Sequence, residues 1–172
     1  MFQYAGLRGI AAHRGFDFMI PESDFNDEWN DHQLFEAFKL KGLTTIGVCP
    51  GPYVQEAHFH FDQNLYDNMP DGHNVYAYLQ STKYFDIIEK EIREDFEFKN
   101  EIKAPCEDMI STVQDPIALH VRRGDYIQNC DNHPPCPKEY YDSALSKFDK
   151  NRTVVIFSDD PKWCSTEFPD DR

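Results

Sequence analysis

Two adjacent arginines follow a short apolar run and carry the clearest chemistry in the sequence. The run Ile117–Val121 has the pattern of a buried strand, and Arg122, Arg123, Gly124 and Asp125 come directly after it. An arginine keeps its charge and donates two parallel hydrogen bonds, which suits it to a diphosphate. A simpler interpretation is that Arg122 and Asp125 form a surface ion pair that closes a turn at Gly124.

A second charged group follows the next predicted strand. Residues Thr153–Phe157 are apolar and mostly β-branched, and Asp159 and Asp160 stand just beyond them, before a helix expected to begin at Pro161. Residues Lys138–Phe148 have apolar side chains at helical spacing. A strand, a helix and a strand predict a parallel βαβ unit, so both acidic residues should leave the same sheet edge as the arginines. Ligands of open α/β sheets bind at that edge.

Four segments, in order along the chain, resemble motifs of the α-1,2-fucosyltransferases, glycosyltransferase family 11. The segment His120–Tyr126 (HVRRGDY) resembles the family's first signature. Met1–Ala5 (MFQYA) resembles the end of its opening Gly-Asn-Gln-Met-Phe-Gln-Tyr-Ala motif. Tyr78–Phe85 (YLQSTKYF) and Phe157–Trp163 (FSDDPKW) resemble two further family segments.

The resemblance implies a function and a fold. The function is inverting, metal-independent transfer of fucose from GDP-fucose to O2 of a terminal galactose-type sugar on an oligosaccharide acceptor. The fold is α/β and GT-B-like, with two Rossmann-like domains facing across a cleft. We expect residues 1–112 to form the acceptor-side domain and residues 113–172 to begin the GDP-fucose-binding domain. The family's glycine-rich turn would precede Met1 and more strands would follow Arg172, so we expect a chain truncated at both ends.

Two other functions agree with the same motifs. One is a non-catalytic nucleotide- or glycan-binding remnant of the fold, which the expected truncation favours. The other is a transferase of the same family that forms a different linkage.

The resemblance also implies roles for the first signature and the opening motif. A fixed cation aimed at the departing diphosphate would stabilise the transition state more than the ground state, and Arg122 is the candidate. Since side chains alternate along a strand, Arg123 should point the other way and support the sheet edge or a carboxylate. We expect Asp125 to pair with Arg123, the alternative being a general base. Gln3 is a supporting residue, and no residue is assigned as general base.

Three further residues are candidates for contacts to the nucleotide. His120 would contact the guanosine, or else be a buried, hydrogen-bonded strand histidine. Asp159 or Asp160 would accept two hydrogen bonds from the N1 and N2 edge of guanine. The alternative for the two aspartates is a helix cap, and we expect one of them to be only that.

Composition excludes some classes of partner. A formal charge of −14 argues against nucleic acid, whose binders need a basic surface. No apolar run approaches the roughly 20 residues of a membrane span, so we expect a cytoplasmic protein that acts at the inner face of the membrane.

The five cysteines are odd in number and irregularly spaced, which fits a reducing compartment. Cys130, His133 and Cys136 lack an obvious fourth ligand, so no zinc site is predicted.

In the first half of the chain, the sequence predicts a helix from Tyr4, a strand over Val75–Leu79 and a helix over Lys83–Phe96. Residues Glu97–Asp115 are charged and contain Pro105, and an inter-domain connection is predicted there. Four aromatic residues could form a platform for a sugar, although such residues more often belong to a core: Tyr53, Phe59, Phe61 and Tyr66.

Overall fold

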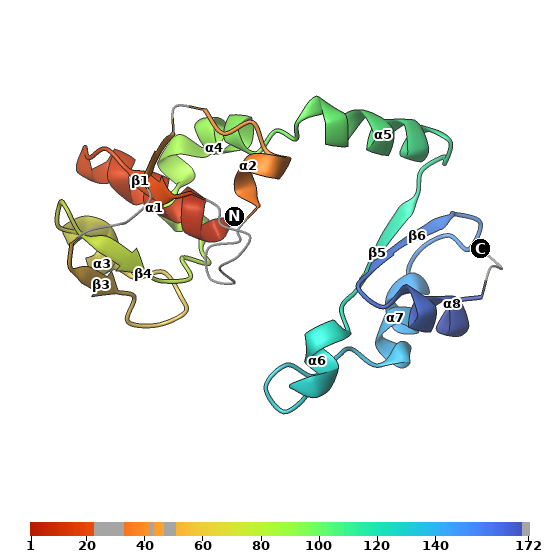
Figure 1. The fold of residues 1–172 in the computed structure, drawn as a ribbon. Coiled ribbons are helices and arrows are strands. Elements are labelled where there is room, and N and C mark those ends of the chain that lie inside the picture. The colour runs from red at the N-terminus through yellow and green to blue at the C-terminus, as the bar shows by residue number, and fades with distance from the viewer. Residues whose placement is uncertain (23–32, 42, 47–50, 170–172) are drawn as a thin grey trace. The chain divides into compact units, whose positions relative to one another are not determined.

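The chain has an α/β fold with small parallel sheets. A computed structural model describes residues 1–22, 33–41, 43–46 and 51–169. Within these ranges the strands form two-stranded parallel sheets, and the chain divides into two compact units, Met1–Ala104 and Pro105–Arg172 (Figure 1).

The first unit contains two of these sheets. Strand β1 (Met19–Pro21) pairs with β2 (Thr44–Ile46), and β3 (Tyr53–Gln55) pairs with β4 (Asn74–Tyr76). The predicted strand over Val75–Leu79 is therefore shorter than expected. It ends at Tyr76, and the predicted extension to Leu79 is not possible, because Leu79 has a positive φ of 52°.

The helices of the first unit surround its longest helix, α1. Helix α1 (Phe2–Arg14) ends at Gly15, whose φ of 72° is the left-handed conformation that glycine adopts at low cost. The other helical elements are α2 (Leu34–Ala37), α3 (Gln63–Asn68), the 3-10 turns η1 (Thr82–Tyr84) and η2 (Asp86–Ile88), and α4 (Glu89–Asp95).

The predicted continuous helix over Lys83–Phe96 is wrong, because it is divided into η1, η2 and α4. Tyr84 is fully buried, and its backbone lies against α1 so closely that a Cβ on Gly9 would come within 2.0 Å of the Tyr84 carbonyl oxygen. A Cβ on Gly6 would likewise meet Leu79 at 2.7 Å. Tertiary packing against α1 thus overrides the helical periodicity of this segment.

Helix α1 separates two apolar clusters. One is built on Tyr4, Ala5, Ile20, Leu34, Phe38 and Ile92, and the other on Ile10, Leu65, Tyr66, Met69, Leu79 and Tyr84. Phe61 and Tyr66 pack with Tyr84 and are core residues, as the ordinary interpretation of the aromatic residues predicts. Tyr53 and Phe59 are exposed.

Two buried carboxylates fix these clusters. Asp95 is 1% exposed and forms an ion pair with Arg8, and it also accepts hydrogen bonds from the Tyr4 hydroxyl at 2.5 Å and the Lys41 backbone N–H at 2.9 Å. Glu56 accepts a hydrogen bond from the Tyr84 hydroxyl at 2.9 Å. Burial raises the pKa of Tyr84 to about 12, so this hydroxyl keeps its proton and remains a donor at neutral pH.

The second unit is built on one parallel pair of strands. Strand β5 (Ile117–Val121) pairs with β6 (Val154–Ser158) along its full length. Helices α7 (Lys138–Leu145) and α8 (Pro161–Glu167) pack on one face, where the core consists of Ile117, Leu119, Val121, Tyr141, Leu145 and Cys164. A short helix, α6 (Gly124–Gln128), follows β5 where a turn and an irregular loop were predicted.

The segment predicted as an inter-domain connection, Glu97–Asp115, is largely helical. Residues Asn100–Ser111 form helix α5, with Pro105 inside it, and the boundary between the two units falls within this helix. Proline removes one backbone N–H, but its fixed φ is compatible with a helix, so the helix continues at the cost of one hydrogen bond.

Replacing Asp95 by alanine should destabilise the first unit strongly. Arg8 and the Tyr4 hydroxyl would lose their buried acceptor, and breaking a buried pair of this kind costs about 3–5 kcal/mol. Urea unfolding followed by circular dichroism measures the loss. The matched control is Glu94→Ala, which removes only exposed ion pairs and should cost about 0–1 kcal/mol. Equal effects of the two substitutions would contradict the role given to Asp95.

Candidate functional site

The carboxyl ends of β5 and β6 bring the predicted charged residues together. The last residues paired between the two strands are Val121 and Ser158, so Arg122 and Asp159 leave the sheet side by side. The prediction of parallel pairing, with both arginines and both aspartates at one edge, is confirmed.

Asp159 connects the two strand ends. Its carboxylate accepts a hydrogen bond from the Arg123 backbone N–H at 2.8 Å and forms an ion pair with the Arg122 guanidinium at 2.9 Å. The backbone N–H of Arg123, followed by that of Gly124 and the charge of Arg122, lowers the pKa of Asp159 below its ordinary value. A Cβ on Gly124 would lie 2.7 Å from an Asp159 carboxylate oxygen, so a side chain here would require the Asp159 carboxylate to shift.

Arg122 is the more accessible of the two arginines. Its side chain is 47% exposed and lies between Asp159 and Asp125, and its Nη2 is 2.6 Å from the Asp125 carboxylate. The guanidinium also lies over the Tyr126 ring, 5.6 Å from its centroid. The expected pairing of Asp125 with Arg123 is therefore wrong. Because α6 begins at Gly124, Asp125 is turned back towards Arg122, three residues earlier.

Arg123 is held on the other side of the strand end, as alternation predicts. Its side chain is 20% exposed, and its Nε donates to Asp160 at 3.1 Å. The guanidinium stacks on Trp163, 4.0 Å from the ring centroid, which is a close cation–π contact. Arg123 thus fastens β5 to the start of α8.

Asp160 is the helix cap predicted for one of the two aspartates. One of its carboxylate oxygens accepts the Trp163 backbone N–H at 3.1 Å, and the other accepts from Arg123. Both oxygens of Asp160 therefore have partners within the chain. Asp159 is bound to Arg122 and to the Arg123 backbone, so a contact from either aspartate to a base would compete with these bonds.

His120 and Gln3 have no hydrogen bond or ion pair to the arginines or aspartates among the contacts of the described residues. His120 is exposed, on the face of β5 opposite the core, and it pairs in register with Phe157, which is 54% exposed. The alternative of a buried strand histidine is therefore wrong. Gln3 belongs to the first unit and donates a hydrogen bond to the Ala77 carbonyl at 2.9 Å.

Trp163 and Tyr126 contact the arginines, a role that the sequence did not predict although each is the last residue of a segment that resembles a family motif. The signal for Trp163 was its position three residues after the capping Asp160, which places it in the first turn of α8. The buried Glu56 could not be found in this way, because its partner Tyr84 is far from it in the sequence.

Arg122 is the group at the strand ends that could contact an anion. A phosphate could replace Asp125 as a partner of Arg122, because that pair is exposed and such pairs contribute only about 0–1 kcal/mol. Arg123 is a poorer candidate, since its bond to Asp160 and its stacking on Trp163 would both have to break.

Neither a metal site nor a membrane span is found in the described part of the chain. Those residues include no group of three or more histidine, cysteine or acidic side chains that could hold a metal ion. Cys106, Cys130 and Cys136 are exposed thiols and Cys164 is a buried one, while Cys49 lies outside the described residues. No described helix combines the length and the apolar character needed to cross a membrane.

Comparison with known proteins identifies the family. The model of glycosyl transferase family 11 matches residues 53–172, which include the strand ends and their arginines. The chain belongs to glycosyl transferase family 11. It is also 28% identical, over 129 residues, to the O-antigen biosynthesis glycosyltransferase WbnK of Escherichia coli. That match covers 67% of this chain and 43% of the relative, so the chain spans less than half of the curated protein. No solved structure matches the chain.

The two arginines should differ in their effect on stability. Arg123→Ala removes a half-buried ion pair and a close cation–π contact and should destabilise the second unit by about 1–3 kcal/mol. Arg122→Ala removes exposed ion pairs and should cost about 1 kcal/mol or less. Urea unfolding of both variants measures the difference. A larger loss for Arg122→Ala would contradict the structural role assigned to Arg123.

Asp159 should contribute to the acid sensitivity of the fold. Its pKa is lowered in the folded state, so its stabilisation is complete above its ordinary pKa and is lost as the pH falls through the folded-state value. Between about pH 5 and pH 2, Asp159→Asn should therefore lose less stability than the wild type does. Unfolding midpoints across this range measure the effect. Asp131→Asn, at an exposed carboxylate, serves as the control and should keep the wild-type slope.

Proposed function

We propose that this chain carries part of an inverting, metal-independent α-1,2-fucosyltransferase. The enzyme would transfer fucose from GDP-fucose to O2 of a terminal galactose-type sugar on an oligosaccharide acceptor. Membership of glycosyl transferase family 11 supports the reaction class. The similarity to WbnK, an O-antigen biosynthesis glycosyltransferase, supports an oligosaccharide acceptor.

The observation that carries the proposal is the placement of Arg122. It lies at the carboxyl end of a parallel strand, it is 47% exposed, and an incoming anion could displace its exposed partner Asp125. In fucosyl transfer, negative charge grows on the departing diphosphate while the sugar becomes oxocarbenium-like. A guanidinium already fixed by Asp159 can stabilise that charge without reorganising, which lowers the barrier.

The remaining residues would serve this site in different ways. Asp159 and Arg123 would hold the strand ends, so that Arg122 keeps its orientation. His120 would contact the guanosine from the exposed face of β5. Asp159 and Asp160 are both candidates for reading guanine, and each would have to give up a bond within the chain to do so.

The whole enzyme would have a GT-B arrangement. In it, residues 1–112 would form the acceptor-side domain and residues 113–172 would begin the GDP-fucose-binding domain. We place its action in the cytoplasm, at the inner face of the membrane. The other candidate is a nucleotide- or glycan-binding remnant without catalysis, which the same site residues would also allow.

GDP should stabilise this chain through Arg122. A ligand that binds only the folded state raises the melting temperature with its concentration. Without divalent metal, GDP should raise the melting temperature of the wild type, ADP should raise it less, and Arg122→Ala should not respond. Arg152→Ala is the matched control, because Arg152 also pairs with an aspartate in the second unit and should leave the GDP response unchanged.

A transfer assay then separates the enzyme from the remnant. Incubation with GDP-fucose and lactose should yield a product whose linkage analysis gives α-1,2 fucose. A chain that responds to GDP but forms no product is the binding remnant. A folded chain that ignores GDP contradicts the proposed donor site.

A further inference from the structure

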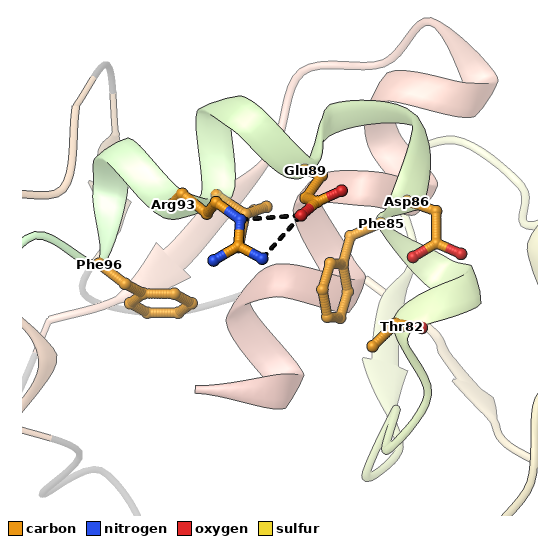
Figure 2. A pocket seen from close by; sticks show the side chains of 7 residues that line it. Thr82, Phe85, Asp86, Glu89, Arg93 and Phe96 are labelled. Carbon is orange, nitrogen blue, oxygen red and sulfur yellow. Dashed lines mark hydrogen bonds and ion pairs between the residues drawn. The ribbon is translucent and has the colours of Figure 1, made fainter.

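The first unit has a pocket that the donor chemistry does not use. Its volume is about 570 Å³, within the usual range for small-ligand sites. It lies along η1, η2 and α4 and combines aromatic with charged side chains (Figure 2). The lining residues are Thr82, Phe85, Asp86, Glu89, Ile92, Arg93 and Phe96.

The two phenyl rings of the pocket pack against other aromatic side chains of the first unit. The Phe96 ring packs edge-on against Tyr4, with ring centroids 5.5 Å apart, and against Phe38 at 5.1 Å. The Phe85 ring lies 6.2 Å from Phe2. Ile92 is 5% exposed. Two phenyl rings fixed in this way offer preformed faces on which the C–H groups of a sugar can pack.

The polar part is an ion pair beside these rings. Glu89 accepts hydrogen bonds from Nε of Arg93 at 2.8 Å and from its Nη2 at 2.7 Å, as Figure 2 shows. Both side chains are exposed, so each retains capacity for further hydrogen bonds. Asp86 and Thr82 add a carboxylate and a hydroxyl. Rigid aromatic faces can pack against the C–H groups of a sugar. The neighbouring donors and acceptors can form hydrogen bonds with its adjacent hydroxyls.

The charge around the pocket favours a neutral sugar. Asp86 and Glu89 outnumber the single guanidinium of Arg93, which Glu89 already neutralises. An adjoining hollow adds the exposed Glu91, while its Glu94 and Glu97 are paired with Lys41 and Lys39. An acidic sugar would bring a further carboxylate into this field and be repelled.

Two segments singled out in the sequence meet at this pocket. Phe2 and Tyr4, from the segment Met1–Ala5, stand behind the rings, and Phe85, from the segment Tyr78–Phe85, lines the pocket itself. Gln3 joins the same two regions through its hydrogen bond to the Ala77 carbonyl. The donor site described above leaves both segments without a role.

We infer that this pocket binds the acceptor as a neutral hexose and discriminates against acidic sugars through Asp86 and Glu89. The inference rests on the proposed function, since it gives the acceptor sugar of that reaction a site and a charge class. Phe85 and Phe96 supply the stacking faces, and Arg93 donates to the sugar hydroxyls.

The test compares two sugars that differ only at C6. Methyl β-galactopyranoside and methyl β-galactopyranosiduronate are titrated into the whole chain, and binding is followed by ligand-observed NMR. The neutral galactoside should bind and the uronate should bind about tenfold more weakly.

Arg93→Ala should weaken galactoside binding by about tenfold, the effect of losing one charged donor. Lys90→Ala, on the same helix but not lining the pocket, should match the wild type.

Glu89→Gln tests the discrimination itself. It should bring the affinities for the two sugars closer together, which a merely structural role of Glu89 would not do. Equal binding of the two sugars by the wild type, no galactoside binding, or unchanged binding by Arg93→Ala would each overturn the inference. The GDP response is measured in separate samples, so failure at this pocket is distinguishable from failure of the donor site.

Discussion

The second unit depends on one carboxylate that joins two strand ends. Asp159, just beyond β6, accepts the backbone N–H of Arg123 and pairs with the Arg122 guanidinium, both just beyond β5. These contacts hold the two strand ends together beyond Val121 and Ser158, the last residues paired between the strands. Gly124 leaves room for this carboxylate, because a side chain there would require Asp159 to shift. The orientation of Arg122 follows from these contacts, and with it the capacity of the edge to bind an anion.

The same strand end gives its two arginines different environments. Arg123 is enclosed by Asp160 and Trp163 and contributes to the fold, whereas Arg122 is exposed and has partners that another anion can replace. In the first unit, close packing has the comparable role. Gly6 and Gly9 allow α1 to approach the segment that contains Leu79 and Tyr84, which in turn positions Thr82 and Phe85 at the pocket. Fixed backbone contacts thus position exposed polar side chains in both units.

The local pattern of apolar and polar residues predicted most of the strands and helices of the second unit. The apolar runs of β5 and β6, the helical spacing of α7 and the Asp-Pro start of α8 together predict a parallel pair and its charged edge. The simpler interpretation paired Asp125 with Arg122, as the structure does, but Arg123 was preferred as its partner, because the short helix at Gly124 has too few apolar residues to show a period. In the first unit the errors came from tertiary contacts. The break after Tyr84 and the buried charges of Asp95 and Glu56 depend on residues far away in the sequence, which local periodicity does not record.

The most direct test of the account observes the two arginine side chains separately. In protein labelled with nitrogen-15 at arginine, the Nε–H signals of Arg122 and Arg123 can be assigned with Arg122→Lys and Arg123→Lys and followed during a GDP titration. The account predicts that the Arg122 signal shifts as the diphosphate replaces Asp125, while the Arg123 signal stays at its position over Trp163. A shift of Arg123 with no change at Arg122, or no shift of either signal on a folded chain, would contradict it.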